Sequence, residues 1–258
     1  MKQADRLKIR PWSFASIAGL GTLALYGACA HLNAKTAVRL ERPDYVKFNK
    51  AAAIRFNLTA KKRQLVYTRL AEYLVDHFNL AERPGIGIDI GGGPGDLVIE
   101  LAARTKQFYW INTDINAWYA QPFAENTLKR ELNHRTGFVF ADVCALPFKD
   151  QYADVVFSRG AYQFWGDLEA GVINIHRILK HGGWAFIGRG FPPSMPEGEI
   201  RDLRDKRLIG GPPYDPDKDA ETFRSIMKNL KVKEYEVIRH KSQDPTVNYG
   251  VWLCFRRG

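Results

Sequence analysis

The chain has 258 residues, of which 45% are hydrophobic and 26% are charged. This composition is typical of a folded globular protein and excludes a disordered, collagen-like or coiled-coil chain. The cysteines, Cys29, Cys144 and Cys254, are too scattered for a disulfide framework or a zinc cluster. Because no HExxH or CxxC accompanies the histidines, we expect no metal site. The length predicts one α/β domain, with or without an appendage.

The net charge of +10 belongs to the N-terminal quarter of the chain. Residues 1–63 contain 13 Lys/Arg and 3 Asp/Glu, whereas residues 64–258 contain 25 of each. A neutral main domain argues against a basic face that binds nucleic acid. We therefore expect a basic leader at 1–63 and a separate domain at 64–258.

The leader contains the uncharged segment Trp12–Ala30 between basic flanks. Nineteen residues of helix span about 28 Å, which is close to the thickness of a bilayer core. We expect a membrane anchor, and the basic residues that follow the segment favour a cytoplasmic location for the main domain. The alternatives are a cleaved signal peptide ending at Ala28-Cys29-Ala30, a lipid-bearing Cys29 with export of the domain, and a docked amphipathic helix.

Beyond the leader, helical and strand patterns alternate. The helical patterns cover Asn57–Ala81, Asp96–Arg104, Asn116–His134 with an interruption near Pro122, Asp167–Lys180 with a glycine C-cap at His181-Gly182-Gly183, Glu199–Leu208 and Asp219–Leu230. The strand patterns cover Ile86–Ile90, Phe108–Thr113, Phe138–Ala141, Ala153–Phe157, Trp184–Gly188, Val232–Arg239 and Asn248–Phe255. This order predicts an α/β fold with a mostly parallel sheet covered by helices on both faces. Because no helix separates the last two strands, one of them should run antiparallel.

A glycine-rich turn, Asp89-Ile90-Gly91-Gly92-Gly93-Pro94-Gly95, joins the first strand to the next helix. Such a turn lets the backbone approach a ligand closely, with amides of the helix N-terminus nearby. A P-loop is excluded because no Gly-Lys-Ser/Thr follows, and a dinucleotide fingerprint would need glycine where Asp96 stands. The acid before the glycines suits a ligand that carries positive charge near the turn.

Two further acids close the next two strands. Asp114 stands at the end of the second strand, where a carboxylate commonly binds the hydroxyls of a ribose. Asp142 closes the third strand, where it can accept from an adenine amino group while the amide of Val143 donates to the ring. Each acid could instead cap a helix. Three acids at successive strand ends favour a single binding crevice.

These segments resemble the class I S-adenosylmethionine-dependent methyltransferases, over about Leu65 to Phe255, and are most similar to the ubiquinone/menaquinone C-methyltransferase-like small-molecule branch. The similar motifs are the glycine turn, Thr113-Asp114-Ile115-Asn116, Ala141–Phe148, Tyr152–Ser158 and Arg177–Gly183, with His181 in place of the usual proline and Gln163 near a frequent histidine. The resemblance implies a Rossmann-like seven-stranded sheet with the last strand antiparallel. It also implies S-adenosyl-L-methionine as cofactor, held by Asp89, Gly91, Gly92, Gly93, Gly95, Asp114, Ile115, Asp142, Val143 and Ser158.

The resemblance further implies methyl transfer to a small-molecule or lipidic acceptor. The acceptor-side candidates follow the fourth and fifth strands: Arg159, Tyr162, Gln163, Trp165, Arg189 and Phe191. For the aromatic residues among them, core packing is the alternative. No residue stands out as a general base. The sequence does not specify the oligomeric state. A cofactor-binding domain without methyl transfer, serving as a sensor or scaffold, stays open. The absence of an Asn/Asp-Pro-Pro-Tyr/Phe segment disfavours a nucleic-acid acceptor.

Overall fold

The computed structural model describes residues 49–205, 215–244 and 247–258. The expected membrane segment Trp12–Ala30 lies outside these residues. None of the helices formed by the described residues is long and apolar enough to cross a membrane.

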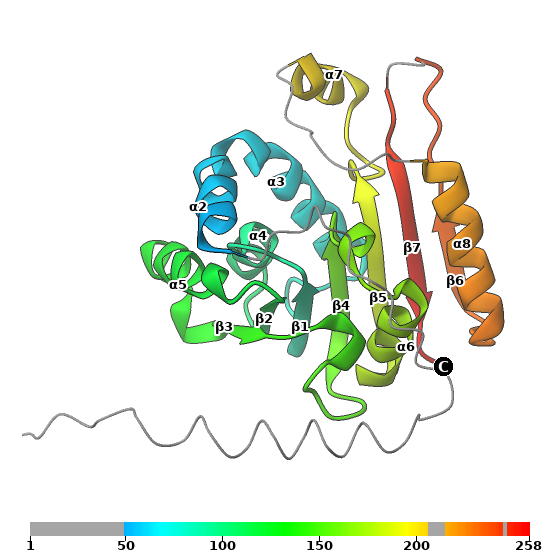
Figure 1. Cartoon of the computed structure of the whole chain (residues 1–258), viewed down its shortest axis with the longest axis horizontal. Coiled ribbons are helices and arrows are strands. Elements are labelled where there is room, and N and C mark those ends of the chain that lie inside the picture. Colours follow the sequence, from blue (N-terminus) through cyan, green and yellow to red (C-terminus); the bar gives the residue numbers. More distant parts are fainter. Residues whose placement is uncertain (1–48, 206–214, 245–246) are drawn as a thin grey trace, which may run out of the picture. The chain divides into compact units, whose positions relative to one another are not determined.

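The core of the fold is a seven-stranded sheet with the order β3-β2-β1-β4-β5-β7-β6. The strands are β1 Gly85–Ile90, β2 Phe108–Asp114, β3 Thr136–Phe140, β4 Ala153–Arg159, β5 Leu179–Gly190, β6 Tyr235–Ile238 and β7 Gly250–Arg256. β1 to β5 pair in parallel, whereas β7 runs antiparallel to both β5 and β6. Figure 1 shows β5 and β7 side by side with opposite directions. The expected mostly parallel sheet with an antiparallel last strand is confirmed.

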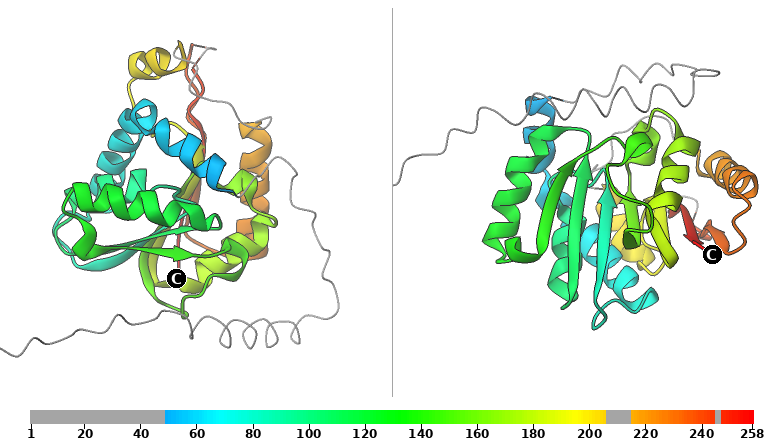
Figure 2. Two further views of the ribbon diagram at one scale, coloured as in Figure 1. Left: turned by 60° about the vertical axis from the view of Figure 1, so that its left-hand side comes forward. Right: turned by 90° about the horizontal axis from the view of Figure 1, so that it is seen from below.

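Helices cover both faces of this sheet. They are α2 Lys50–Leu58, α3 Ala60–His77, α4 Asp96–Arg104, α5 Ala120–Lys129, α6 Leu168–Ile178, α7 Glu197–Asp205 and α8 Pro216–Asn229. Residues of α3, α4 and α5 pack on one face with Val155 and Phe157, and residues of α6 and α8 pack on the other with Val156. Alternate residues of a central strand therefore enter different cores, which explains its continuous apolar sequence. The two views in Figure 2 show the helices on either side of the sheet.

Three local predictions were wrong. The helix expected over Asn57–Ala81 is divided, since α2 ends at Leu58 and α3 covers Ala60–His77. Helix α6 ends at Ile178 and the chain enters β5 at Leu179, so Gly182 and Gly183 lie inside a strand instead of capping a helix. Pro122 does not interrupt its helix, since it is the third residue of α5. An N–H at that position has no partner within the helix, so proline costs no hydrogen bond there.

Helix α2 begins at Lys50, directly after the capping residue Asn49. The side-chain oxygen of Asn49 accepts from the N–H of Ala52 at 2.9 Å, and three alanines follow in the first turn. Helix α3 starts two residues after α2 ends. Residues on the leader side of the predicted division at 63/64 therefore take part in the described fold.

Candidate functional site

A cavity of about 430 Å³ opens where the carboxyl ends of β1, β2 and β4 meet. Small-molecule sites commonly have volumes of roughly 300–1,000 Å³ and lie at this edge of an open parallel sheet. Its lining residues come from α2, α3, the glycine turn and the segments after β2, β3 and β4. They are Ala52, Phe56, Arg63, Tyr67, Ile90, Gly91, Gly92, Gly93, Asp114, Ile115, Asn116, Tyr119, Ala141, Asp142, Val143, Arg159, Gly160, Ala161, Phe164, Trp165 and Gly166.

The glycine turn is fixed by its packing. A Cβ atom on Gly92 would lie 1.9 Å from Oδ1 of Asn112 and 2.5 Å from Oδ2 of Asp89, so only glycine fits. Gly93 has a φ of +56°, a left-handed conformation that favours glycine. The turn therefore presents bare backbone to the cavity, as the sequence predicts.

Asp114 is held rigidly at the edge of the cavity. Its Oδ2 accepts from the N–H of Gly93 at 2.9 Å, and its Oδ1 accepts from the N–H of Asn116 at 2.8 Å. Burial raises the pKa of Asp114 to about 6, against the lowering effect of these backbone hydrogen bonds. Each carboxylate oxygen retains capacity to accept one further hydrogen bond, which suits the hydroxyls of a ligand.

Asp142 and Val143 also line the cavity. Oδ1 of Asp142 accepts from the N–H of Cys144 at 3.0 Å and caps the short 3-10 helix η3, Val143–Ala145. Capping, the alternative considered for each acid, is therefore correct for Asp142. The same residue nevertheless borders the cavity, so capping and ligand binding do not exclude each other here.

Three predicted cofactor residues lie behind the cavity wall. Asp89 is buried and its Oδ1 has no hydrogen-bond partner, and burial together with the charges of Asp114 and Asp96 raises its pKa well above the usual range. Ser158 donates to the carbonyl oxygen of Ile90 at 2.8 Å and so ties β4 to β1.

Gly95, the third of these residues, serves packing. A Cβ atom at this position would lie 2.4 Å from a ring carbon of Phe123. A glycine here therefore allows α4 and α5 to approach each other. Of the glycines in the turn, only Gly91, Gly92 and Gly93 line the cavity.

The acceptor-side candidates divide into two groups. Arg159 and Trp165 line the cavity. Tyr162 points elsewhere, because its hydroxyl donates to Asp219 at 2.5 Å, and Gln163 donates to the carbonyl oxygen of Gly160 at 2.7 Å. Arg189 lies in β5 outside the lining set, and Phe191 is buried in a separate apolar cluster under α7.

Sequence reasoning missed the wall that α2 and α3 contribute. Arg63 forms an ion pair with Asp96 at 2.9 Å, donates to Thr59, and lies 3.6 Å from the ring centre of Phe56. Tyr67 is buried, its pKa is raised by burial, and the guanidinium of Arg159 lies 4.9 Å from its ring centre.

Helical periodicity reveals a buried face but not which cavity that face borders. One available signal was charge, because residues 49–71 contain six Lys/Arg and no acid.

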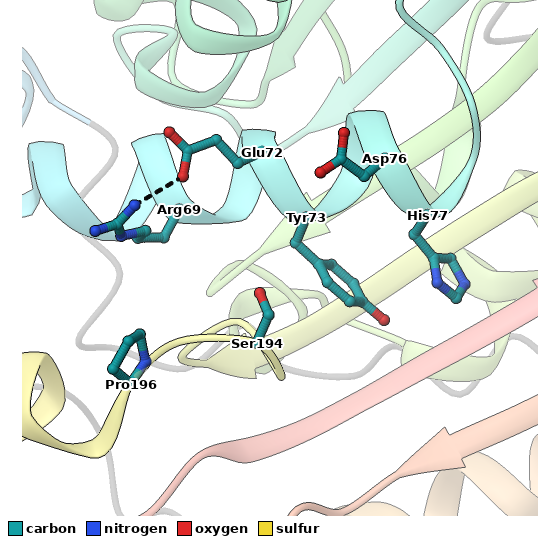
Figure 3. Close-up of a pocket in the computed structure, with 7 residues that line it drawn as sticks. All are labelled: Arg69, Glu72, Tyr73, Asp76, His77, Ser194 and Pro196. Carbon is teal, nitrogen blue, oxygen red and sulfur yellow. Dashed lines mark hydrogen bonds and ion pairs between the residues drawn. The ribbon is translucent and has the colours of Figure 1, made fainter.

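A second cavity, of about 610 Å³, lies between α3 and the segment after β5. Figure 3 shows its lining side chains, with Arg69, Glu72, Tyr73, Asp76 and His77 on α3 and Ser194 and Pro196 opposite. Arg69 is engaged there by Glu72 and Glu199. Neither the glycine turn nor the strand-end acids reach this cavity, so it is not the candidate site although it is larger.

Comparison with known proteins identifies the family of the domain. The family described as "Methyltransferase domain" matches residues 88–187. A structure from Methanococcus maripaludis, described as an S-adenosyl-L-methionine-dependent methyltransferase, is 28% identical with a TM-score of 0.66 and covers 84% of this chain and 97% of that chain. This chain carries a class I S-adenosylmethionine-dependent methyltransferase domain.

Among the curated relatives of this methyltransferase domain are malonyl-[acyl-carrier protein] O-methyltransferase 1 of Coxiella burnetii, 24% identical over 63% of this chain, and 2-methyl-6-phytyl-1,4-hydroquinone methyltransferase of Arabidopsis thaliana, 31% identical over 41%. The ubiquinone/menaquinone biosynthesis C-methyltransferase of Vibrio parahaemolyticus is 25% identical over 63%. The matches span 53%, 30% and 64% of these relatives' own lengths.

The cofactor of this domain is S-adenosylmethionine, and the residues present fit it. The site offers strand-end carboxylates to a ligand rich in hydroxyl and amino donors. Behind Gly92, outside the lining set, lie the buried side chains of Asp89 and Asn112, each with an Oδ1 atom that has no hydrogen-bond partner. Unsatisfied buried acceptors beside the turn favour a ligand with donors, and this cofactor carries an ammonium group.

Proposed function

We propose that Gly91–Gly93 lie against the amino-acid part of S-adenosylmethionine, that Asp114 accepts from the ribose hydroxyls, and that Asp142 and Val143 contact the adenine. When bound, the cofactor supplies a methyl group already activated on a sulfonium. The chain itself must hold the acceptor in line with the sulfur–methyl bond and exclude water. Near Asp114, Ile115 supplies an apolar side of the cavity.

We propose further that the acceptor is a small molecule or lipid with an aromatic or quinol-like head. One observation carries this: Phe56, Tyr67, Tyr119, Phe164 and Trp165 border the same cavity as the two strand-end acids. Such a wall suits a flat apolar ring. Two of the curated relatives support it, since their names specify 2-methyl-6-phytyl-1,4-hydroquinone and ubiquinone/menaquinone biosynthesis, whereas malonyl-[acyl-carrier protein] in the name of a third has no such ring.

Two arginines at the cavity indicate the charge of the acceptor. Arg63 and Arg159 also border the cavity, and Arg159 directs Nε and one terminal nitrogen to the carbonyl oxygen of Gly190 at 3.2 and 3.0 Å. Their positive charge favours an acceptor that bears an acidic hydroxyl or carboxyl group.

The test is transfer of labelled methyl from S-adenosylmethionine into a lipid extract, with mass analysis of the product. We expect label in an apolar, ring-containing molecule, and at least about tenfold less with Asp114→Ala at matched protein and subsaturating cofactor. The same fold occurs in a [4+2]-cyclase, with a TM-score of 0.51 and 15% identity, so the fold alone does not require methyl transfer. Cofactor binding without label transfer to any extract fraction would overturn the proposal in favour of a sensor or scaffold.

We also propose that Trp12–Ala30 tethers the domain to a membrane with the catalytic part in the cytoplasm. The support is the charge distribution, with the excess of +10 within residues 1–63, since anionic headgroups attract such flanks. Fractionation with protease protection tests it. A mature chain that begins at Cys29 or His31 outside the cytoplasm would contradict it.

A further inference from the structure

The surface around the mouth of the cofactor cavity is unusually apolar. Seven of the eleven large hydrophobic side chains exposed among the described residues lie within two residues of a lining residue, or are lining residues themselves. We call six of them, all but Leu65, the apolar rim: Ile54, Phe56, Leu58, Trp118, Phe140 and Phe164. Leu58 is 76% exposed, Phe140 61% and Trp118 53%. Three of them, Ile54, Phe56 and Leu58, lie on the single helix α2, and exposed apolar residues that gather in one place are typical of an interaction surface.

Helix α2 contributes half of this rim and buries almost nothing. Ala53 is its single buried residue, while Ile54 and Leu58 follow one another at a four-residue spacing on an exposed face. In Figure 1, α2 lies at the end of the α2–α3 pair beside α5. A helix that exposes its branched side chains gains little from packing within the domain, so its apolar residues need another explanation.

The charged residues around the apolar rim indicate what kind of surface binds there. No acidic residue occurs in residues 49–71, and Lys50, Arg55, Lys61 and Lys62 are exposed there. The ammonium group of Lys50 lies 5.4 Å from the ring centre of Trp118, a pairing that joins a basic group to an amphipathic aromatic ring. Tryptophan and lysine together are typical of the headgroup region of a bilayer. Lysines are by contrast depleted in protein–protein interfaces.

We propose that α2 and the apolar rim dock on an anionic lipid surface, so that the mouth of the cavity faces the bilayer. Ile54 and Leu58 enter the boundary between headgroups and acyl chains, and Lys50, Arg55, Lys61 and Lys62 bind the lipid phosphates. The inference rests on the proposed function in that a lipidic acceptor would enter the cavity from the membrane without crossing water. It does not depend on Trp12–Ala30, which precedes α2 in the sequence.

Hydrogen–deuterium exchange of the full chain tests this, because peptides from the leader and from α2 are read separately. The probes are vesicles of phosphatidylcholine alone and vesicles with about 30% phosphatidylglycerol. With the anionic vesicles we expect residues 50–65 and 117–119 to exchange at least about threefold more slowly, and α8 to be unchanged. Added salt should reverse much of the protection.

Substitutions in α2 and α3 test whether these helices form the lipid-binding surface. Leu58→Asp and the pair Lys61→Glu with Lys62→Glu should each abolish the protection of α2. The matched controls are Ile173→Asp, an exposed apolar residue on α6, and Lys218→Glu with Lys228→Glu on α8, and both should leave it intact. Because Leu58 and both lysines are exposed, these variants should fold, which thermal denaturation checks.

Two outcomes would overturn the inference. In the first, anionic vesicles protect the leader peptides but not residues 50–65. In the second, protection of α2 rises with protein concentration and is independent of lipid, which would make the rim a contact between protein molecules. The exchange measurement needs neither cofactor nor acceptor, so a negative result would not contradict the proposed methyl transfer. Likewise, an absence of cofactor binding would not contradict the docking of α2 on lipid.

Discussion

The two walls of the cofactor cavity are built in different ways. The floor consists of backbone at Gly91–Gly93 and carboxylates at strand ends, placed by hydrogen bonds of the sheet and turn. The opposite wall consists of side chains from α2 and α3, placed by Arg63 through its contacts with Asp96, Thr59 and Phe56. An added side chain at Gly92 should therefore damage the floor through a steric clash, whereas a substitution in the wall should act through the loss of a contact. Substitutions in the two walls should therefore differ in what they disturb.

Gly92→Val should cause the greatest damage. Its Cβ would lie 1.9 Å from the side chain of Asn112, which is fully buried and cannot yield. We expect a loss of about 3 kcal/mol or more in the free energy of unfolding and no measurable cofactor binding. Gly93→Ala is the control, since its Cβ would make only ordinary contacts, with Phe56 at 3.4 Å and Tyr119 at 3.8 Å, and would cost about 1 kcal/mol through its left-handed backbone. Equal effects of the two variants would contradict this account of the floor.

Asp114→Ala should weaken S-adenosylmethionine binding by about 1.5–3 kcal/mol, the loss typical of a charge-assisted hydrogen bond. Calorimetry of the folded variant measures the affinity. Asp76→Ala, an exposed acid on α3, is the control and should bind like the parent. An unchanged affinity of Asp114→Ala would show that the cofactor lies elsewhere.

The stability of the cofactor-free protein should fall as the pH rises from about 4 to 6. Burial raises the pKa of Asp114 from 3.8 to about 6, so in this window the folded state binds a proton that the unfolded chain has released. The contribution is on the order of 2–3 kcal/mol, fully present below pH 4 and lost above pH 6.

Denaturation of Asp114→Asn across this range measures the contribution. The slope should be reduced but not removed, because Asp89 also has a raised pKa. Superimposable pH profiles of the variant and the parent would refute the assignment.

Arg63→Met should loosen the wall while leaving the floor intact. It removes an ion pair whose side chains are 14% and 13% exposed, so we expect a loss of about 2 kcal/mol in the free energy of unfolding. Hydrogen exchange should rise in α2 more than in the glycine turn. Arg201→Met breaks the more exposed pair with Asp244 and should cost no more than about 0.5 kcal/mol. A uniform rise in exchange across both walls would contradict the contrast.

Tyr162→Phe should have the smallest effect. It removes one hydrogen bond to Asp219 and should cost about 1 kcal/mol in the free energy of unfolding. Because Tyr162 lies outside the cavity, methyl transfer should keep its KM and kcat. A fall in kcat at unchanged stability would restore Tyr162 to the acceptor side, where the sequence placed it.

The amino-acid sequence by itself determined the order of strands and helices, the glycine turn and the acids at the strand ends. These features are local, because alternation of apolar residues, a required backbone conformation and the position of a residue at the end of a strand are all encoded within a few residues. That one of the last two strands runs antiparallel also followed from the chain, since two strands without a helix between them pair antiparallel.

Only the tertiary structure decided which side chains share the cavity. Tyr162 and Trp165 stand three residues apart after the same strand, yet one packs against Phe223 and the other lines the site. Phe56 and Arg63 come from helices that precede the first strand, and they reach the site because Asp96, at the start of α4, holds Arg63. Such contacts join residues more than thirty positions apart. Their geometry depends on how helices pack on the sheet, which no short stretch of sequence specifies.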